Sequence, residues 1–198
     1  MATTDRATDG ATGKASPRDR LLDAAARLFY RDGVSIGVEA LCRSAGVSKR
    51  SMYQLFDSKD EVLAASLERR IPAYEAQLAL GSPHAGTPRE RILHVFERLE
   101  KASGDADYWG CPYLAALVEL KNPEHPASVV ARAAKERLKT AFRTQAELGG
   151  ARDPELLARQ LMLVFDGASA RSGARVEALD DGLATATAGA LLDASGVT

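Results

Sequence analysis

The sequence lacks long apolar runs and contains few aromatic residues and only two cysteines. No run of about 18 apolar residues occurs, which excludes a transmembrane helix. Residues 1–15 have no apolar segment, so we expect no signal peptide and a cytoplasmic protein. Cys42 and Cys111 are too few for a disulfide framework. The net charge of −1 excludes a uniformly basic polyanion binder, so any nucleic-acid surface must be local.

Motifs for catalysis and for cofactors are missing as well. The sequence has no nucleophile elbow, phosphate-binding loop or Gly-x-Gly-x-x-Gly stretch. The histidines His84, His94 and His125 do not lie at metal-ligand spacing from either cysteine. We therefore expect no metal and no cofactor. An enzyme with a reactive Cys111 is the weaker alternative, because no base or orienting group stands at motif spacing from it.

Alanine is abundant, at 36 of 198 residues, which favours helices over a large sheet. After a polar tail at 1–15, apolar residues recur at helical spacing, and strand-like alternation is missing. The pattern predicts an all-α fold. We expect the tail to be disordered; the alternative is an arm that touches DNA through Lys14 and Arg18.

Local signals predict where several helices begin and end. Ser16 and Asp153 are expected N-caps, and Ser58 with Glu61 matches a capping box. Pro72 is expected to kink or end its helix near Arg70. The last helix is expected to begin near Asp180.

Three short predicted helices within residues 16–60 have the spacing of a helix-turn-helix. The turn is Ala45–Ser48, where Gly46 suits a backbone with positive φ. Lys49, Arg50 and Ser51 form the first turn of the predicted recognition helix, which enters the major groove in such motifs. Residues 14–60 carry nine Lys/Arg and six Asp/Glu, a local net charge of +3.

The segments LLDAAARLFYRDG (21–33) and VEALCRSAGVSKRSMYQLFDSKDEVL (38–63) resemble the DNA-binding domain of the TetR family of bacterial transcriptional regulators. A second stretch, GCPYLAALVELKNPEHP (110–126), is similar to a Gly-Cys-Pro segment of one subgroup. The resemblance implies an all-helical homodimer with an N-terminal helix-turn-helix and a C-terminal effector domain. It also implies a repressor that a small molecule releases from an operator in double-stranded DNA.

The motif and the resemblance together give a set of expected DNA contacts. Ile36-Gly37 stand where the family often has Thr or Ser, so Ser35 is expected to supply that hydroxyl. Gln54 stands where Arg or His is common, so base preference should differ from that of such relatives. Leu55 is expected in the core. The expected contacts are Ser35, Lys49, Arg50, Ser51, Tyr53, Gln54 and Lys59.

The remaining expectations concern the C-terminal part. We expect a disordered tail at 1–15, a DNA-binding domain at 16–60, and a ligand-binding and dimerisation domain at 61–198. The last two long helices, about 153–171 and 180–195, are expected to form the homodimer. A small apolar or aromatic effector is expected near Phe96, Trp109, Cys111, Tyr113, Phe142, Met162 and Phe165. Ordinary core packing of these residues, oxidation of Cys111, and control by a protein partner are the alternatives.

Overall fold

A computed structural model describes residues 15–78 and 86–197 of the chain. These residues form helices and no strands, which confirms the predicted all-α fold. Most of the predicted disordered tail and most of the predicted loop at 81–88 lie outside the described residues. The helices are α1 (Pro17–Asp32), α2 (Val38–Ala45), α3 (Lys49–Leu55), α4 (Lys59–Gln77), α5 (Pro88–Ser103), α6 (Pro112–Leu120), α7 (Pro126–Leu148), α8 (Pro154–Gly173) and α9 (Leu183–Ser195).

Two of the predicted caps are confirmed and one is modified. The Ser16 hydroxyl accepts a hydrogen bond from the Asp19 amide at 3.1 Å, and Asp153 caps α8 in the same way. Ser58 caps α4 through the Glu61 amide at 3.1 Å. The Glu61 carboxylate, however, accepts from the Asp57 amide at 2.8 Å. The reciprocal bond of a capping box therefore reaches one residue further out than predicted.

One of the two outcomes expected at Pro72, the end of the helix, is wrong, and so is the expected start of the last helix. α4 does not end near Arg70 but continues past Pro72 to Gln77. Pro72 and Glu68 are both exposed, so water can satisfy the carbonyl that loses its intrahelical partner. The last helix begins at Leu183 rather than near Asp180, because Gly182 precedes it with a φ of 77°.

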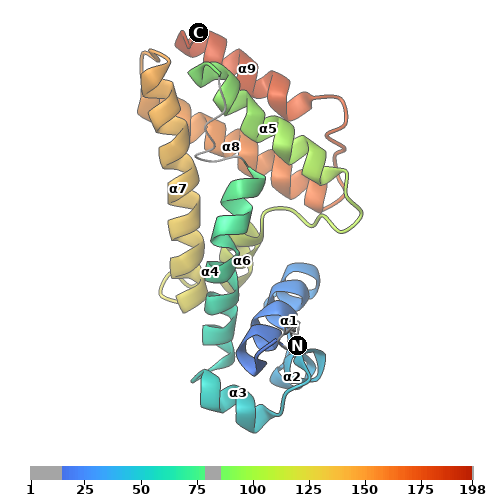
Figure 1. Cartoon of the computed structure of the whole chain (residues 1–198). Helices are drawn as coiled ribbons and strands as arrows, with labels where there is room; N and C mark the ends of the chain where they lie inside the picture. Colours follow the sequence, from blue (N-terminus) through green and yellow to red (C-terminus); the bar gives the residue numbers. More distant parts are fainter. Residues whose placement is uncertain (1–14, 79–85, 198) are drawn as a thin grey trace, which may run out of the picture.

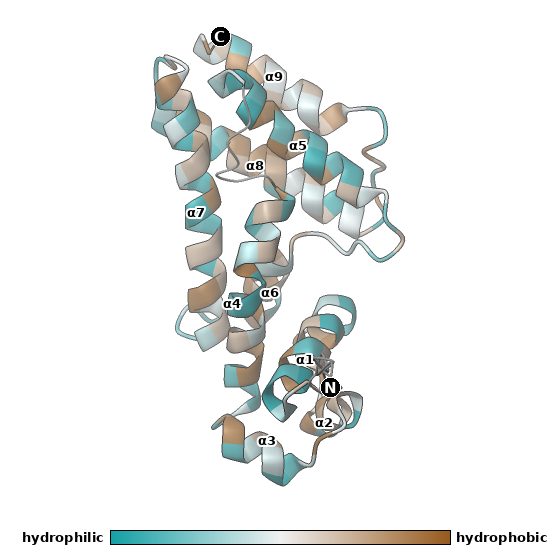
Figure 2. Cartoon of the chain, in the orientation of Figure 1, coloured by the Kyte–Doolittle hydropathy of each residue, from teal (hydrophilic) through white to brown (hydrophobic). Residues whose placement is uncertain are grey.

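The helices pack around two hydrophobic cores. In Figure 1, α1, α2 and α3 gather at one end of the molecule and α5, α8 and α9 at the other, with α4 and α7 running between them. The first core joins α1–α4 to α6 and the start of α7, and the second joins α5, α7, α8 and α9. Figure 2 shows hydrophilic and hydrophobic residues alternating along α4, α5 and α7, as expected of helices with one apolar side.

None of the helices in the described ranges is both long and apolar enough to cross a bilayer.

Candidate nucleic-acid interface and neighbouring crevice

The turn between α2 and α3 is held in a fixed geometry. Gly46 ends α2 in the left-handed region, with a φ of 62°, and its amide bonds the Arg43 carbonyl at 3.2 Å. A Cβ at this position would meet nothing within 4 Å, so glycine is required here by its backbone conformation and not by space. The Arg20 guanidinium donates to the Ala45 carbonyl at 3.1 Å, which fixes the turn to α1.

One side of α3 packs inward and the other faces solvent. Met52 is completely buried and Phe56, which follows the helix, is 7% exposed. Because successive residues are rotated by about 100°, the direction opposite this buried side falls on Gln54. Arg50 and Ser51 flank Gln54 on that outward side. α3 lies at the far end of the molecule from α9 (Figure 1).

The predicted DNA contacts on α3 lie together on this surface. Arg50, Tyr53 and Gln54 are exposed, and more than half of the Tyr53 side-chain surface is accessible. The Ser51 hydroxyl lies 2.9 Å from that of Ser48. The Tyr53 ring therefore lies mainly in solvent, outside the core.

Two lysines of the predicted set, Lys49 and Lys59, are already engaged within the protein. Lys49 forms an ion pair with Glu39 of α2 and lowers the pKa of that carboxyl. Both side chains are more than half exposed, so water screens the pair and a phosphate can replace the carboxylate. Lys59 donates to the Val34 carbonyl at 3.0 Å. Ser35, the next residue, is exposed.

The expectation that Leu55 lies in the core is wrong. Its side chain is 40% exposed. Met52 and Phe56 occupy the buried side of the short helix, and Leu55 lies about 60° from Met52 around the helix axis, at the border between the buried and the exposed side. Leu55 therefore adds an apolar edge to the outward surface of α3.

The seven predicted ligand-binding residues do not line one cavity, because they are divided between the two cores and the surface. Phe96, Phe142 and Phe165 are at most 1% exposed, and Phe96 lies 5.6 Å from Phe142 and 6.3 Å from Phe165 between ring centroids. These rings fill the second core. Tyr113 points into the first core and bonds the Leu67 carbonyl at 3.2 Å.

The other three predicted ligand-binding residues line two separate hollows near the surface of the protein. Met162 lines an open groove of about 470 Å³ between α7 and α8. Trp109 and Cys111 line a separate crevice of about 280 Å³ between α6 and the end of α8. Its other lining residues are small or aliphatic: Gly110, Leu114, Ala115, Val118, Ala170, Gly173 and Ala174. This crevice combines two of the predicted residues in one apolar site.

Cys111 precedes α6 as its N-cap, with Pro112 at the first helical position. Oxidation of Cys111 was one of the alternatives for this part of the chain. The Sγ atom, however, is 3.1 Å from the Tyr74 hydroxyl, which donates to it, and the residue is 4% exposed. The thiol is therefore almost completely buried and already accepts a hydrogen bond.

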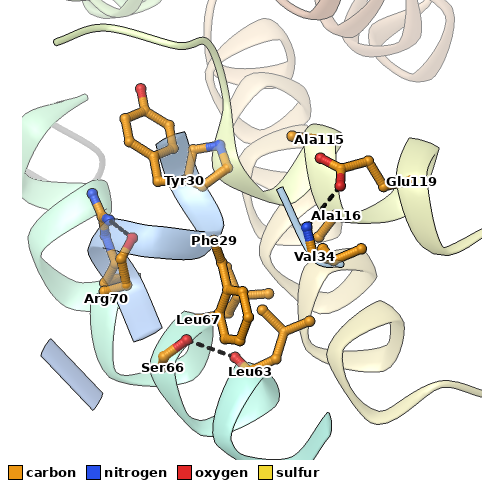
Figure 3. Close-up of a pocket in the computed structure, with 12 residues that line it drawn as sticks. Phe29, Tyr30, Val34, Leu63, Ser66, Leu67, Arg70, Ala115, Ala116 and Glu119 are labelled. Atoms are coloured by element: carbon orange, nitrogen blue, oxygen red, sulfur yellow. Dashed lines mark hydrogen bonds between the residues drawn. The ribbon is translucent and has the colours of Figure 1, made fainter. Parts of the chain in front are cut away.

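A hydrogen bond joins α6 to the segment that follows α1, and no sequence pattern predicts it. The Glu119 carboxylate accepts from the Val34 amide at 2.7 Å (Figure 3). The small cavity beside this bond, about 20 Å³, has room for about one water molecule. The partners lie 85 positions apart in the sequence, so only the tertiary structure reveals the bond.

The comparisons with known proteins agree on one family. Residues 21–66 match the family model described as bacterial regulatory proteins, tetR family. A solved TetR transcriptional regulator of Streptomyces avermitilis MA-4680 is 59% identical over 93% of this chain and all of that chain, with a TM-score of 0.90.

Curated relatives match mainly through the N-terminal part. An uncharacterised HTH-type transcriptional regulator of Mycobacterium tuberculosis H37Rv is 36% identical over 76 residues, and the match spans 38% of each protein. The HTH-type transcriptional repressor KstR2 of Rhodococcus jostii RHA1 is 31% identical over 97 residues, 46% of this chain and 48% of that protein. The chain thus spans less than half the length of these two curated relatives.

Proposed function

Because this chain belongs to the TetR family of DNA-binding transcriptional regulators, we propose that it is a repressor that reads an inverted-repeat operator through α3. The observation that carries the proposal is the outward surface of α3, where Arg50 and Gln54 are exposed and Ser51 beside them is half-buried. The local excess of basic residues supports binding to phosphates. The repressor KstR2 is one of its relatives, which supports repression over activation.

Each residue of the surface has a proposed role set by its chemistry. The Arg50 guanidinium can bond O6 and N7 of guanine, and the Gln54 amide can bond adenine. Lys49, Ser51 and Tyr53 are suited to phosphates, as are Ser35 and Lys59 beside the α1–α2 loop. We propose that residues 16–60 form the DNA-binding domain and that residues 61–198 form the domain that binds the effector and the second copy of the chain.

Replacing Arg50 by alanine tests the reading surface. We expect Arg50→Ala to weaken binding to the selected operator about 5- to 150-fold, because a bidentate base contact is worth about 1–3 kcal/mol. Fluorescence anisotropy of a labelled duplex measures the change. Arg137→Ala, which removes an exposed arginine of α7, is the matched control and should leave affinity unchanged. Equal affinities of wild type and Arg50→Ala would remove Arg50 from the interface.

We propose that two copies associate through α8 and α9. A stripe on α8 carries Leu156, Leu163 and Gly167 at helical spacing, and Leu163 is 76% exposed. Leucine on such a stripe would gain from burial against a second copy. Two recognition helices would then meet successive major grooves, whose centres are about 34–36 Å apart.

We propose the crevice between α6 and α8 as the effector site. Its walls are apolar, and the Trp109 ring at its edge carries the Arg175 guanidinium 5.4 Å from its centroid. A small, flat, largely apolar molecule fits these walls. A protein partner in place of a small molecule remains the second candidate, because the crevice is open to solvent.

A thermal-shift screen of small aromatic compounds tests the effector site. A compound that binds the folded protein raises the melting temperature. Val118 is 60% exposed on the wall of the crevice, so Val118→Asp introduces a charge there without disturbing the core. We expect this variant to lose the stabilisation that a bound compound gives the wild type. A compound that stabilises both proteins equally would place the effector elsewhere.

The cytoplasm is the proposed location, since an operator in chromosomal DNA is reached there. An enzymatic role for Cys111 is not favoured, because the family consists of regulators and because the Tyr74 hydroxyl donates a hydrogen bond to the thiol.

A further inference from the structure

The hydroxyl of Tyr30 joins the DNA-binding helices to the wall of the crevice. Tyr30 lies in the last turn of α1, two residues before its end. Its hydroxyl donates to the Gly110 carbonyl at 2.9 Å and accepts from the Trp109 amide at 2.9 Å. Trp109 and Gly110 both line the proposed effector crevice. One side chain of α1 is therefore bonded to the backbone of two consecutive residues of that wall.

The Tyr30 ring is held from the other side by α4. The Arg70 guanidinium lies 5.3 Å from the ring centroid and also donates to the Ala26 carbonyl of α1 at 3.3 Å. Figure 3 shows the ring at the edge of the small cavity, with its hydroxyl directed away from Phe29. Burial raises the pKa of the Tyr30 hydroxyl, so it keeps its proton and its donor function.

The segment bonded by Tyr30 packs tightly against α8. A Cβ at Gly110, whose φ is 90°, would lie 2.9 Å from the Ser169 carbonyl oxygen. A Cβ at Gly173 would lie 2.5 Å from the backbone carbon of Trp109. Close-packed backbones do not deform independently. A molecule that separates α6 from the end of α8 must therefore displace Trp109 and Gly110 as well.

A displacement of Trp109 and Gly110 can be transmitted to the recognition helix through α1. α1 is one helix from Pro17 to Asp32, with Tyr30 in its last turn and Arg20 in its first. Arg20 bonds the Ala45 carbonyl in the turn that precedes α3. Movement at Tyr30 thus reaches the helix-turn-helix through α1, a single helix.

We infer that Tyr30 is a positioning residue that couples the crevice wall at Trp109–Gly110 to the orientation of the recognition helix. The inference rests on the proposed function, because it concerns the regulation of the same DNA-binding surface. Coupling between two sites is reciprocal, so DNA bound at α3 must also change the environment of the crevice wall. Trp109 is the single tryptophan of the chain and stands in that wall, where it reports this change.

The test uses the full chain and a duplex selected from a random-sequence pool. Binding is followed by anisotropy of the labelled duplex, and the crevice wall by Trp109 emission and its quenching by acrylamide. Tyr30→Phe keeps the ring and removes both hydrogen bonds. Tyr108→Phe is the matched control, since its hydroxyl bonds Ser169 of α8, at 3.3 Å, and among the described residues no group of α1. Melting curves establish that both variants are folded.

We expect the duplex to change Trp109 emission and quenching in the wild type and in Tyr108→Phe. Tyr30→Phe should still bind the duplex but lose the Trp109 response. A response in Tyr30→Phe equal to that of the wild type, no response in the wild type, or equal loss in Tyr108→Phe would each overturn the inference. Failure of the wild type to bind any duplex would instead overturn the proposed function, and the inference with it.

Discussion

Leu163→Glu is expected to convert the protein from a dimer to a monomer and to weaken operator binding by about 10²- to 10⁴-fold. The loss in affinity follows from multivalency, because two linked recognition helices bind the second half-site at high effective concentration. Leu163 is 76% exposed on α8, so a charge at this position should change the folding stability of a single chain very little. In a dimer through α8 the two carboxylates would be buried near each other, at a large desolvation cost.

Sedimentation velocity measures the oligomeric state, and anisotropy measures operator affinity at the same protein concentration. Leu148→Glu is the control, because Leu148 is 65% exposed but belongs to the last turn of α7. This control should remain dimeric and bind normally. If Leu163→Glu stays dimeric, the interface does not include this part of α8.

Gly173→Ala is expected to destabilise the fold by about 3 kcal/mol, the upper part of the usual range for overpacking. The added Cβ would lie 2.5–2.6 Å from the backbone of Trp109 and Gly110, and backbone atoms cannot rotate away. For a chain of this size each kcal/mol corresponds to about 2–4 °C, so the melting temperature should fall by roughly 6–12 °C.

Gly189→Ala in α9 is the matched control for this effect. A Cβ at Gly189 would meet its nearest neighbours at 3.9–4.0 Å, an ordinary contact distance. Alanine has the higher helix propensity, so this variant should be unchanged or slightly more stable. Thermal unfolding at one protein concentration compares the two variants. Equal stability of Gly173→Ala and wild type would mean that the segment at Trp109 can move aside freely.

The fold and the turn before α3 could be predicted because their signals are local. Helical periodicity, the Ser16 and Asp153 caps and the glycine turn at Gly46 depend on residues a few positions apart. The position of Leu55 was mistaken because hydrophobicity alone does not say which side of a seven-residue helix is covered. α4 passes Pro72 because exposed carbonyls near it can bind water.

The effector residues could not be grouped correctly from sequence, because aromatic content does not distinguish a packed core from a crevice. The rings of Phe96, Phe142 and Phe165 pack against each other in the second core, whereas Trp109 lies at the surface. Tyr30 was not identified at all, since its partners lie 79 and 80 positions away. Such contacts have no period or motif to reveal them.

The central claim is that two copies of the outward surface of α3 read one operator, and selection of duplexes from a random-sequence pool tests it most directly. The wild type should enrich an inverted repeat whose half-site centres are about 10 base pairs, or a multiple of that, apart. Arg50→Ala should select the same repeat with base preference lost at one symmetric pair of positions. Enrichment of no repeat by the wild type, or an unchanged preference in Arg50→Ala, would contradict the account.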